Sequence, residues 1–254
     1  MRSKAMLCFL AAVFLGACHP GIAPRMDFPD SRTGSLLQHL NTRNKGLESI
    51  KAIGRLRLWN AKGRQSTRIA WLAALDGRMR AVVLGPAGNA WMRFSYDGGS
   101  LYFASAAREG VRKKGCEDPG LQRILNVPIS IGELIAYLGG RVPVYEYEEA
   151  AFVPGRASSD AEAPQQLVLT NDWSGLREKI RLRPDGNSAS SVAIYEGEDL
   201  RYRAKLADYR QVNGFSLPGR IEVTGAGSAG FVLRVERIWT NIPVEDEQFV
   251  ISRQ

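Results

Sequence analysis

The side chains best suited to covalent or metal chemistry in this 254-residue chain are two histidines and three cysteines. His19 and His39 have no second histidine or cysteine at the spacing of a zinc site. The segment 214–219 places a serine between glycines, but it has one residue too many for the Gly-x-Ser-x-Gly pattern of hydrolases. The Gly-x-x-x-x-Gly-Lys-[Ser/Thr] loop that cradles nucleotide phosphates is absent from the sequence, and the glycine-rich segment 225–230 is expected to be a turn. The sequence therefore predicts that the protein is not an enzyme and uses no metal and no cofactor.

Cys18 has the most informative position of the three cysteines. Arg2 and Lys4 precede an uncharged apolar stretch, residues 5–15, that is shorter than the roughly 20 residues of a membrane-spanning helix. The sequence Leu15-Gly16-Ala17-Cys18 resembles the bacterial lipobox, in which the thiol receives lipid such as palmitate and the signal is cut before it. The alternative is an ordinary secretory signal in which Cys18 is incidental.

The lipobox predicts three segments. Residues 1–17 would be a signal peptide, residues 18–32 a lipidated tether rich in proline, and residues 33–254 one folded domain. Each buried CH₂ of a lipid contributes about 0.8 kcal/mol, so two or three acyl chains would hold the protein stably on a membrane.

The charge of the chain argues against nucleic acid as a partner. The formal net charge is +8, and loss of the signal would remove two of these charges. The result is only mildly basic, which suits an anionic lipid surface better than nucleic acid. The densest basic run is more typical of a solvated loop than of a binding patch; it comprises Arg108, Arg112, Lys113 and Lys114. Cys116 would remain without a cysteine partner, as a free thiol outside any site.

Helical patterns are few and short. One helix is expected at 35–45, and another short one at 118–125. Ser130 could cap a third helix, with Glu133 as its reciprocal partner three residues on. Gly139-Gly140 would end that helix.

Period-two alternation dominates the rest of the chain and predicts antiparallel strands with one buried face. We count about ten or eleven strands, so the predicted fold class is mainly β, a half-open antiparallel barrel covered by short helices. The inward side chains could line a hydrophobic cavity large enough for a lipid, or they could form an ordinary packed core. These residues are Leu56, Leu58, Ile69, Trp71, Val83, Met92, Phe94, Ile180, Leu182, Ile194, Ile221, Val223 and Phe231.

Five short motifs, in order, resemble the LolB family of outer-membrane lipoprotein receptors, within the wider LolA and LolB half-barrel superfamily. Ile53-Gly54-Arg55-Leu56-Arg57-Leu58 is similar to the family's first strand, and Ile69-Ala70-Trp71 to its second. Val83-Leu84-Gly85-Pro86-Ala87-Gly88 resembles the hairpin that follows. The later motifs run from Val127 to Pro143 and from Leu217 to Ile221.

The resemblance implies a cavity that receives the acyl chains of lipoproteins from a soluble, LolA-like periplasmic carrier and releases them into the outer membrane. Binding alone would achieve this transfer, by a monomer anchored at the periplasmic face of that membrane. The hairpin Gly85, Pro86, Ala87, Gly88 would meet the membrane or the partner. The family has a leucine at its tip where this chain has Ala87, and Trp91 could substitute because tryptophan favours membrane interfaces.

Two other classes of function remain open from the sequence. A protein with the same fold could act as a non-transporting interaction module in envelope assembly, and a closed cavity filled with side chains would favour that class. An envelope hydrolase would need a polar cleft with a nucleophile and a base, for which the sequence lacks a histidine.

Overall fold

The computed structural model describes residues 31–153, 165–186 and 188–252. Cys18, the signal peptide and nearly all of the tether therefore lie outside the described residues, and their assignments stay predictions. Among the described residues, no helix is long and apolar enough to cross a membrane.

Strands make up most of the structure. The first half of the chain contains α1 (Ser31–Thr42), β1 (Ser49–Asn60), β2 (Gly63–Ala74), β3 (Met79–Leu84), β4 (Ala90–Tyr96), β5 (Ser100–Ser105), β6 (Arg108–Gly115), α2 (Gln122–Leu125) and α3 (Ile131–Leu138). The second half contains β7 (Glu149–Val153), β8 (Gln166–Asn171), β9 (Leu176–Leu182), β10 (Ala189–Glu196), β11 (Asp199–Ala207), β12 (Arg210–Val212), β13 (Phe215–Leu217), β14 (Arg220–Gly225), β15 (Gly230–Thr240) and the short 3₁₀ helices η1 (Ala226–Ser228) and η2 (Asp246–Phe249).

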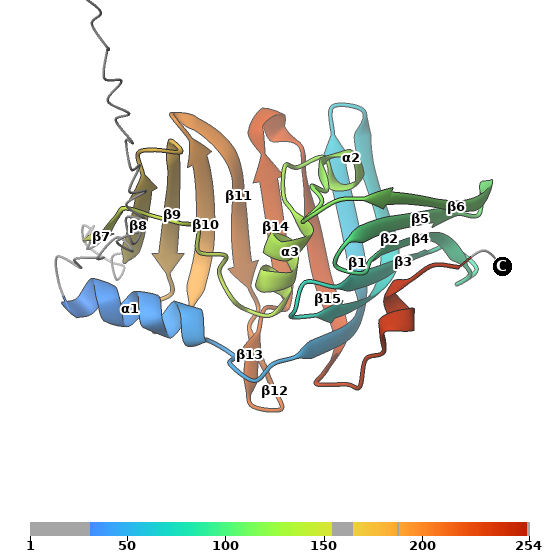
Figure 1. Cartoon of the computed structure of the whole chain (residues 1–254), viewed down its shortest axis with the longest axis horizontal. Helices are drawn as coiled ribbons and strands as arrows, with labels where there is room; N and C mark the ends of the chain where they lie inside the picture. Colours follow the sequence, from blue (N-terminus) through green and yellow to red (C-terminus); the bar gives the residue numbers. More distant parts are fainter. Residues whose placement is uncertain (1–30, 154–164, 187, 253–254) are drawn as a thin grey trace, which may run out of the picture.

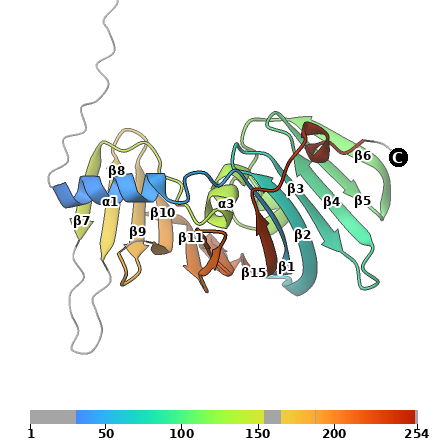
Figure 2. The ribbon, with the colours of Figure 1, turned by 90° about the horizontal axis from the view of Figure 1, so that it is seen from below.

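Thirteen of these strands form one antiparallel sheet in the order β6-β5-β4-β3-β2-β1-β15-β14-β11-β10-β9-β8-β7. The sheet is not closed, because β6 and β7 at its two ends do not pair with each other. Figure 2 shows the sheet bending between the strands around β7–β11 and those around β2–β6, with α3 between the two groups. The half-open barrel predicted from the sequence is confirmed, although the expected number of strands was too low.

Strand β6 is one reason for the low count. Its basic residues were expected to lie in a loop, but they form the edge strand that pairs with β5. Charged side chains are common on edge strands because they discourage pairing with another chain. An edge strand that is wet on both faces has no apolar alternation for a sequence pattern to detect.

Two helices pack on the inner face of the sheet. Figure 1 shows α1 running across β7–β10, and α3 lying in front of the strands around β14. Helix α3 begins and ends as predicted. Ser130 and Glu133 form the reciprocal capping box, and the helix stops at Gly139-Gly140. We call the side of the sheet that carries these helices the inner face and the opposite side the outer face.

Gly54 allows the two halves of the barrel to meet closely. Strand β15 has a bulge beside this residue, and a Cβ at position 54 would lie 2.2 Å from the carbonyl oxygen of Arg234. Any other residue would push β15 away from β1, so the close packing of these two strands requires glycine at this position of the motif.

Candidate functional site

The strand register places all the predicted cavity residues on the inner face. Leu56 lies opposite Leu233, which lies opposite Ile221, and Leu58 lies opposite Phe231 in the same way. Side chains directly opposite one another point to the same side of a sheet. The register thus brings these side chains to one face of the sheet, from β4 across to β9.

Most of these inner side chains are packed, and most of the packed ones lie on strands near α1 and α3. Ile180, Ile194, Ile221 and Val223 have no solvent-accessible surface, and the others in this group are at most 6% exposed. The group also contains Leu56, Trp71, Leu182 and Phe231. A side chain without accessible surface cannot border a water-sized space, so in this conformation these residues are core. Their role as a cavity lining stays a prediction for a conformation in which α3 has moved.

The remaining predicted residues lie at the other end of the inner face and are only half-buried. Ile69, Val83 and Met92 are opposite one another on β2, β3 and β4. Phe94 follows on β4, opposite Phe103 on β5. These residues form a partly exposed apolar surface that we call the open end, and Leu58 on β1, opposite Gln65 of β2, is half-buried as well. Phe103 was missed from the sequence because β5 is short and Arg112 lies opposite it.

Polar contacts hold α3 against the strands of the filled region. Tyr202 on β11 donates a 2.7 Å hydrogen bond to Oε1 of Glu133, and the hydroxyl of Tyr145 donates to the same oxygen. The hydroxyl oxygens of Tyr137 and Tyr202 lie 3.2 Å apart, and since the Tyr202 proton points to Glu133, Tyr137 is the donor. Oε2 of Glu133 accepts the backbone N–H of Ser130 at 2.6 Å. The carboxylate of Glu133 thus ties the start of α3 to β11.

A second carboxyl group lies in the same region and is fully buried. Glu178 on β9 has no exposed surface, and its Oε1 has no hydrogen-bond partner among the described residues. Its Oε2 accepts a long bond, 3.4 Å, from the backbone N–H of Tyr145. Burial raises the pKa of Glu178 well above the ordinary value of 4.5, and the negative charge of Glu133 raises it further. Glu178 is therefore protonated under conditions in which an exposed glutamate would be ionised.

The C-terminal end of α3 is tied to the turn between α1 and β1. Nδ2 of Asn44 donates to the carbonyl oxygen of Gly139 at 2.7 Å, and Nε of Arg43 donates to that of Gly140 at 3.0 Å. Arg141 returns a bond of 2.9 Å to the carbonyl oxygen of Asn44. Both ends of α3 are thus held by specific polar contacts, in addition to the apolar stripe beneath it.

The predicted hairpin projects from the sheet between β3 and β4. Pro86, Ala87 and Gly88 are exposed, and Gly88 has a φ of +79°, which the turn requires. The backbone N–H of Gly85 donates to the carbonyl oxygen of Asn89, which closes the loop. Trp91 is 50% exposed but belongs to the outer face, so it does not lie on the same side as the open end.

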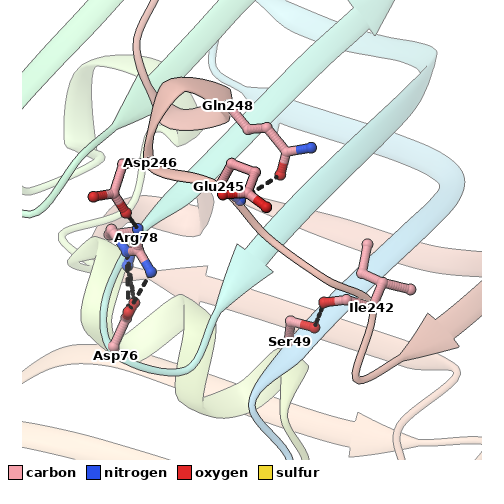
Figure 3. Close-up of polar contacts among 7 residues, drawn as sticks. All are labelled: Ser49, Asp76, Arg78, Ile242, Glu245, Asp246 and Gln248. Atoms are coloured by element: carbon pink, nitrogen blue, oxygen red, sulfur yellow. Dashed lines mark hydrogen bonds and ion pairs between the residues drawn. The ribbon is translucent and has the colours of Figure 1, made fainter.

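The C-terminal segment covers part of the outer face. Figure 3 shows Arg78 between Asp76 and Asp246, and Ser49 donating to the carbonyl oxygen of Ile242 at 2.7 Å. Phe249 from η2 is fully buried, and its carbonyl oxygen accepts a bond from Ser95. Beyond it, a groove of about 790 Å³ has Trp91, Arg93, Val111 and Ile251 among its lining residues.

The other candidate residues lie apart from the inner face. Cys116 is a free, half-buried thiol whose Sγ lies 3.7 Å from the carbonyl oxygen of Lys114. His39 is in α1, and within the described part of the chain no three His, Cys, Asp or Glu side chains gather as metal ligands would.

Comparison with known proteins finds solved structures of similar fold. No family model matches the sequence, and no curated protein matches it. A LolA superfamily protein from Nitrosomonas europaea superposes with a TM-score of 0.57 and 13% identity, over 86% of this chain and 97% of that protein. The fold of this chain is thus similar to that of this LolA superfamily protein. At such low identity this agreement concerns the architecture, and the resemblance to LolB in particular stays a prediction.

Two further solved structures have the same architecture. One is a domain named for outer membrane lipoprotein sorting, from Vibrio parahaemolyticus, with a TM-score of 0.58 and 13% identity over 85% of this chain and 94% of that one. The other is a DUF1329 family protein from Desulfovibrio piger, with a TM-score of 0.57 and 12% identity over 88% of this chain and 98% of that one.

Proposed function

We propose that this protein is a lipid-anchored envelope protein that binds acyl chains on the inner face of its half-barrel. We further propose that these chains belong to lipoproteins, taken from a LolA-like periplasmic carrier and released into the outer membrane. Transfer occurs by binding and release, with no covalent step and no cofactor. The name of the Vibrio structure, which refers to lipoprotein sorting, supports this class of cargo.

The observation that carries the proposal is the open end. Ile69, Val83 and Met92 lie side by side on neighbouring strands, with Phe94 next on β4, and their apolar side chains are only half-buried. Leu58 on β1 is half-buried as well. Apolar surface of this kind favours an apolar ligand, since its removal from water contributes about 25 cal/mol per Å². Acyl chains would first contact this surface, and longer chains would extend under α3 once it moves.

The test compares one substitution in each region of the inner face. Phe94→Trp enlarges a half-buried side chain at the open end, so we expect weaker binding of a fluorescent fatty acid with little loss of thermal stability. Ile221→Trp enlarges a fully buried side chain, and overpacking a core costs about 1–3 kcal/mol. We therefore expect Ile221→Trp to lower the melting temperature.

Mass spectrometry of the protein purified from cells provides the independent readout, since native lipid should co-purify with it. If the wild type carries no lipid and Phe94→Trp binds the fatty acid like the wild type, acyl binding at the open end is refuted.

The filled region favours a second candidate function. Beneath α3 lie side chains that have no accessible surface. A non-transporting interaction module of the same fold would have such a filled interior. In that case α3 would stay in place, and added fatty acid would leave the hydrogen exchange of its backbone amides unchanged. Acyl binding predicts faster exchange in α3 when the fatty acid is present.

A further inference from the structure

Arginine side chains gather on the outer face of the sheet, on the side away from α3. Arg55 lies directly opposite Arg68 on β2 and Arg234 on β15, and Arg234 lies directly opposite Arg220 on β14. Arg57 follows two residues after Arg55 and points to the same face. We call these five residues the arginine cluster. Like charges directly opposite each other destabilise a sheet, and here three such pairs follow one another across four strands.

Acidic side chains neutralise only part of this cluster. Glu236 lies 2.9 Å from Arg68 and 4.0 Å from Arg55, so it is shared between two guanidinium groups. Glu222 pairs with Arg220. Among the described residues, Arg57 and Arg234 form no ion pair. Five positive charges thus face two negative ones, which leaves an excess of positive charge at the centre of the outer face.

A small cavity lies among these guanidinium groups. Its volume is about 50 Å³, and it is lined by Arg55, Arg57, Arg220 and Arg234 with Val232. The buried Nε of Arg220 has no hydrogen-bond acceptor among the described residues. A buried donor without a partner commonly indicates a water molecule or an ion that completes the site. A cavity of this size exceeds the roughly 10–15 Å³ that one water needs, so a small oxyanion is a reasonable occupant.

We propose that the arginine cluster is a binding site for a phosphate group. Guanidinium groups bind phosphate oxygens through paired hydrogen bonds, and the unsatisfied Nε of Arg220 would donate one of them. The phosphate could be free in solution or belong to the headgroup of an anionic phospholipid. The site lies on the opposite face of the sheet from the proposed acyl site, and it does not depend on that proposal.

The experiment uses two probes and two variants. Arg57→Gln combined with Arg234→Gln removes the two cluster charges that lack an ion pair. Arg203→Gln is the control, because it removes one exposed charge from β11 on the same face but outside the cavity. The probes are inorganic phosphate, titrated at low ionic strength, and phosphatidylethanolamine vesicles with and without phosphatidylglycerol.

We expect the double variant to lose at least about tenfold in affinity for one of the probes, and the control to stay within about twofold. A loss with inorganic phosphate assigns the site to free phosphate. A loss confined to the phosphatidylglycerol vesicles assigns it to a lipid headgroup. The unliganded double variant should melt at the same temperature as the wild type or higher, because Arg234 takes part in two of the three like-charge pairs.

Three results would overturn the proposal. The first is that neither probe binds the wild type. The second is that Arg203→Gln weakens binding as much as the double variant, since diffuse positive charge would then explain it. The third is that the unliganded double variant melts well below the wild type, because the arginines would then have a structural role.

Discussion

The buried carboxyl group of Glu178 should make the stability of this protein fall as pH rises. In the folded state this group keeps its proton, because burial and the charge of Glu133 raise its pKa well above 4.5. In the unfolded chain the same group ionises near its ordinary value. Between these two values the folded state binds more protons than the unfolded state, so raising the pH favours unfolding.

The expected size of this effect follows from proton linkage. The free energy of unfolding falls by about 1.4 kcal/mol for each pH unit above 4.5, as long as the pH stays below the raised pKa of Glu178. For a domain of this length, 1 kcal/mol corresponds to a shift of about 2–4 °C in melting temperature. The contribution is fully present at pH values below 4.5 and is progressively lost above that value.

Glu178→Gln removes this dependence and keeps the shape of the protonated side chain. We expect the variant to match the wild type near pH 4.5 and to exceed it in melting temperature at pH 7. The assay is thermal unfolding followed by circular dichroism at several pH values. Glu196→Gln, at an exposed position on the neighbouring strand β10, serves as the control and should follow the wild type throughout.

Two outcomes would contradict this reasoning. If Glu178→Gln loses stability with pH as steeply as the wild type, another group causes the dependence. If the variant is less stable than the wild type at pH 7, Glu178 is ionised in the folded protein and its charge is stabilising.

Three further predictions concern the anchor, the free thiol and the hairpin. Cys18→Ser should yield an uncleaved or soluble precursor, and retention in the membrane pellet after high-salt and alkaline washing would place the anchor elsewhere. Cys116→Ala should leave fatty-acid binding and mobility on non-reducing gels unchanged, whereas loss of a covalent dimer would reveal a functional sulfur. Ala87→Leu should raise liposome association of the unlipidated domain because it adds exposed apolar area at the hairpin tip. Ala87→Glu should slow transfer of an acylated substrate into liposomes without affecting its uptake, and wild-type behaviour of both hairpin variants would make the hairpin only a turn.

The sequence was sufficient to predict structural features that depend on residues close together in the chain. The start of α3 is an example, because Ser130 and Glu133 lie three residues apart and satisfy each other's backbone groups. Its end is another, since Gly140 adopts a φ of +67°, a backbone conformation that favours glycine. The side of the sheet to which each side chain points could also be predicted, because alternation along a strand assigns it without knowledge of the partner strand.

Contacts between distant residues were beyond the sequence pattern. Glu133 was recognised as the partner of Ser130, but its bond to Tyr202 joins residues 69 positions apart and requires the register of β11 beneath α3. The burial of Phe249 was equally hidden, because a single aromatic residue after an acidic run has no periodicity. The same limitation applies to the arginine cluster, whose members come from four strands.

The division of the inner face into a filled region and an open end follows from where the covering helices can reach. Helix α1 covers β7–β10 and α3 lies over the strands around β14, while the half-buried apolar residues of the open end lie farther along the sheet, mainly on β2–β4 (Figure 1). Apolar and polar residues alternate in the same way in both regions, because this alternation shows only that one face of a strand is apolar. What differs is whether protein covers that face. Glu178 on β9 accepts a hydrogen bond from the backbone of Tyr145, on the segment that follows α3, so displacement of α3 together with that segment would expose Glu178 to water and let it ionise. Movement of α3 and release of a proton are thus linked, and a ligand that lifts the helix should bind more tightly as pH rises.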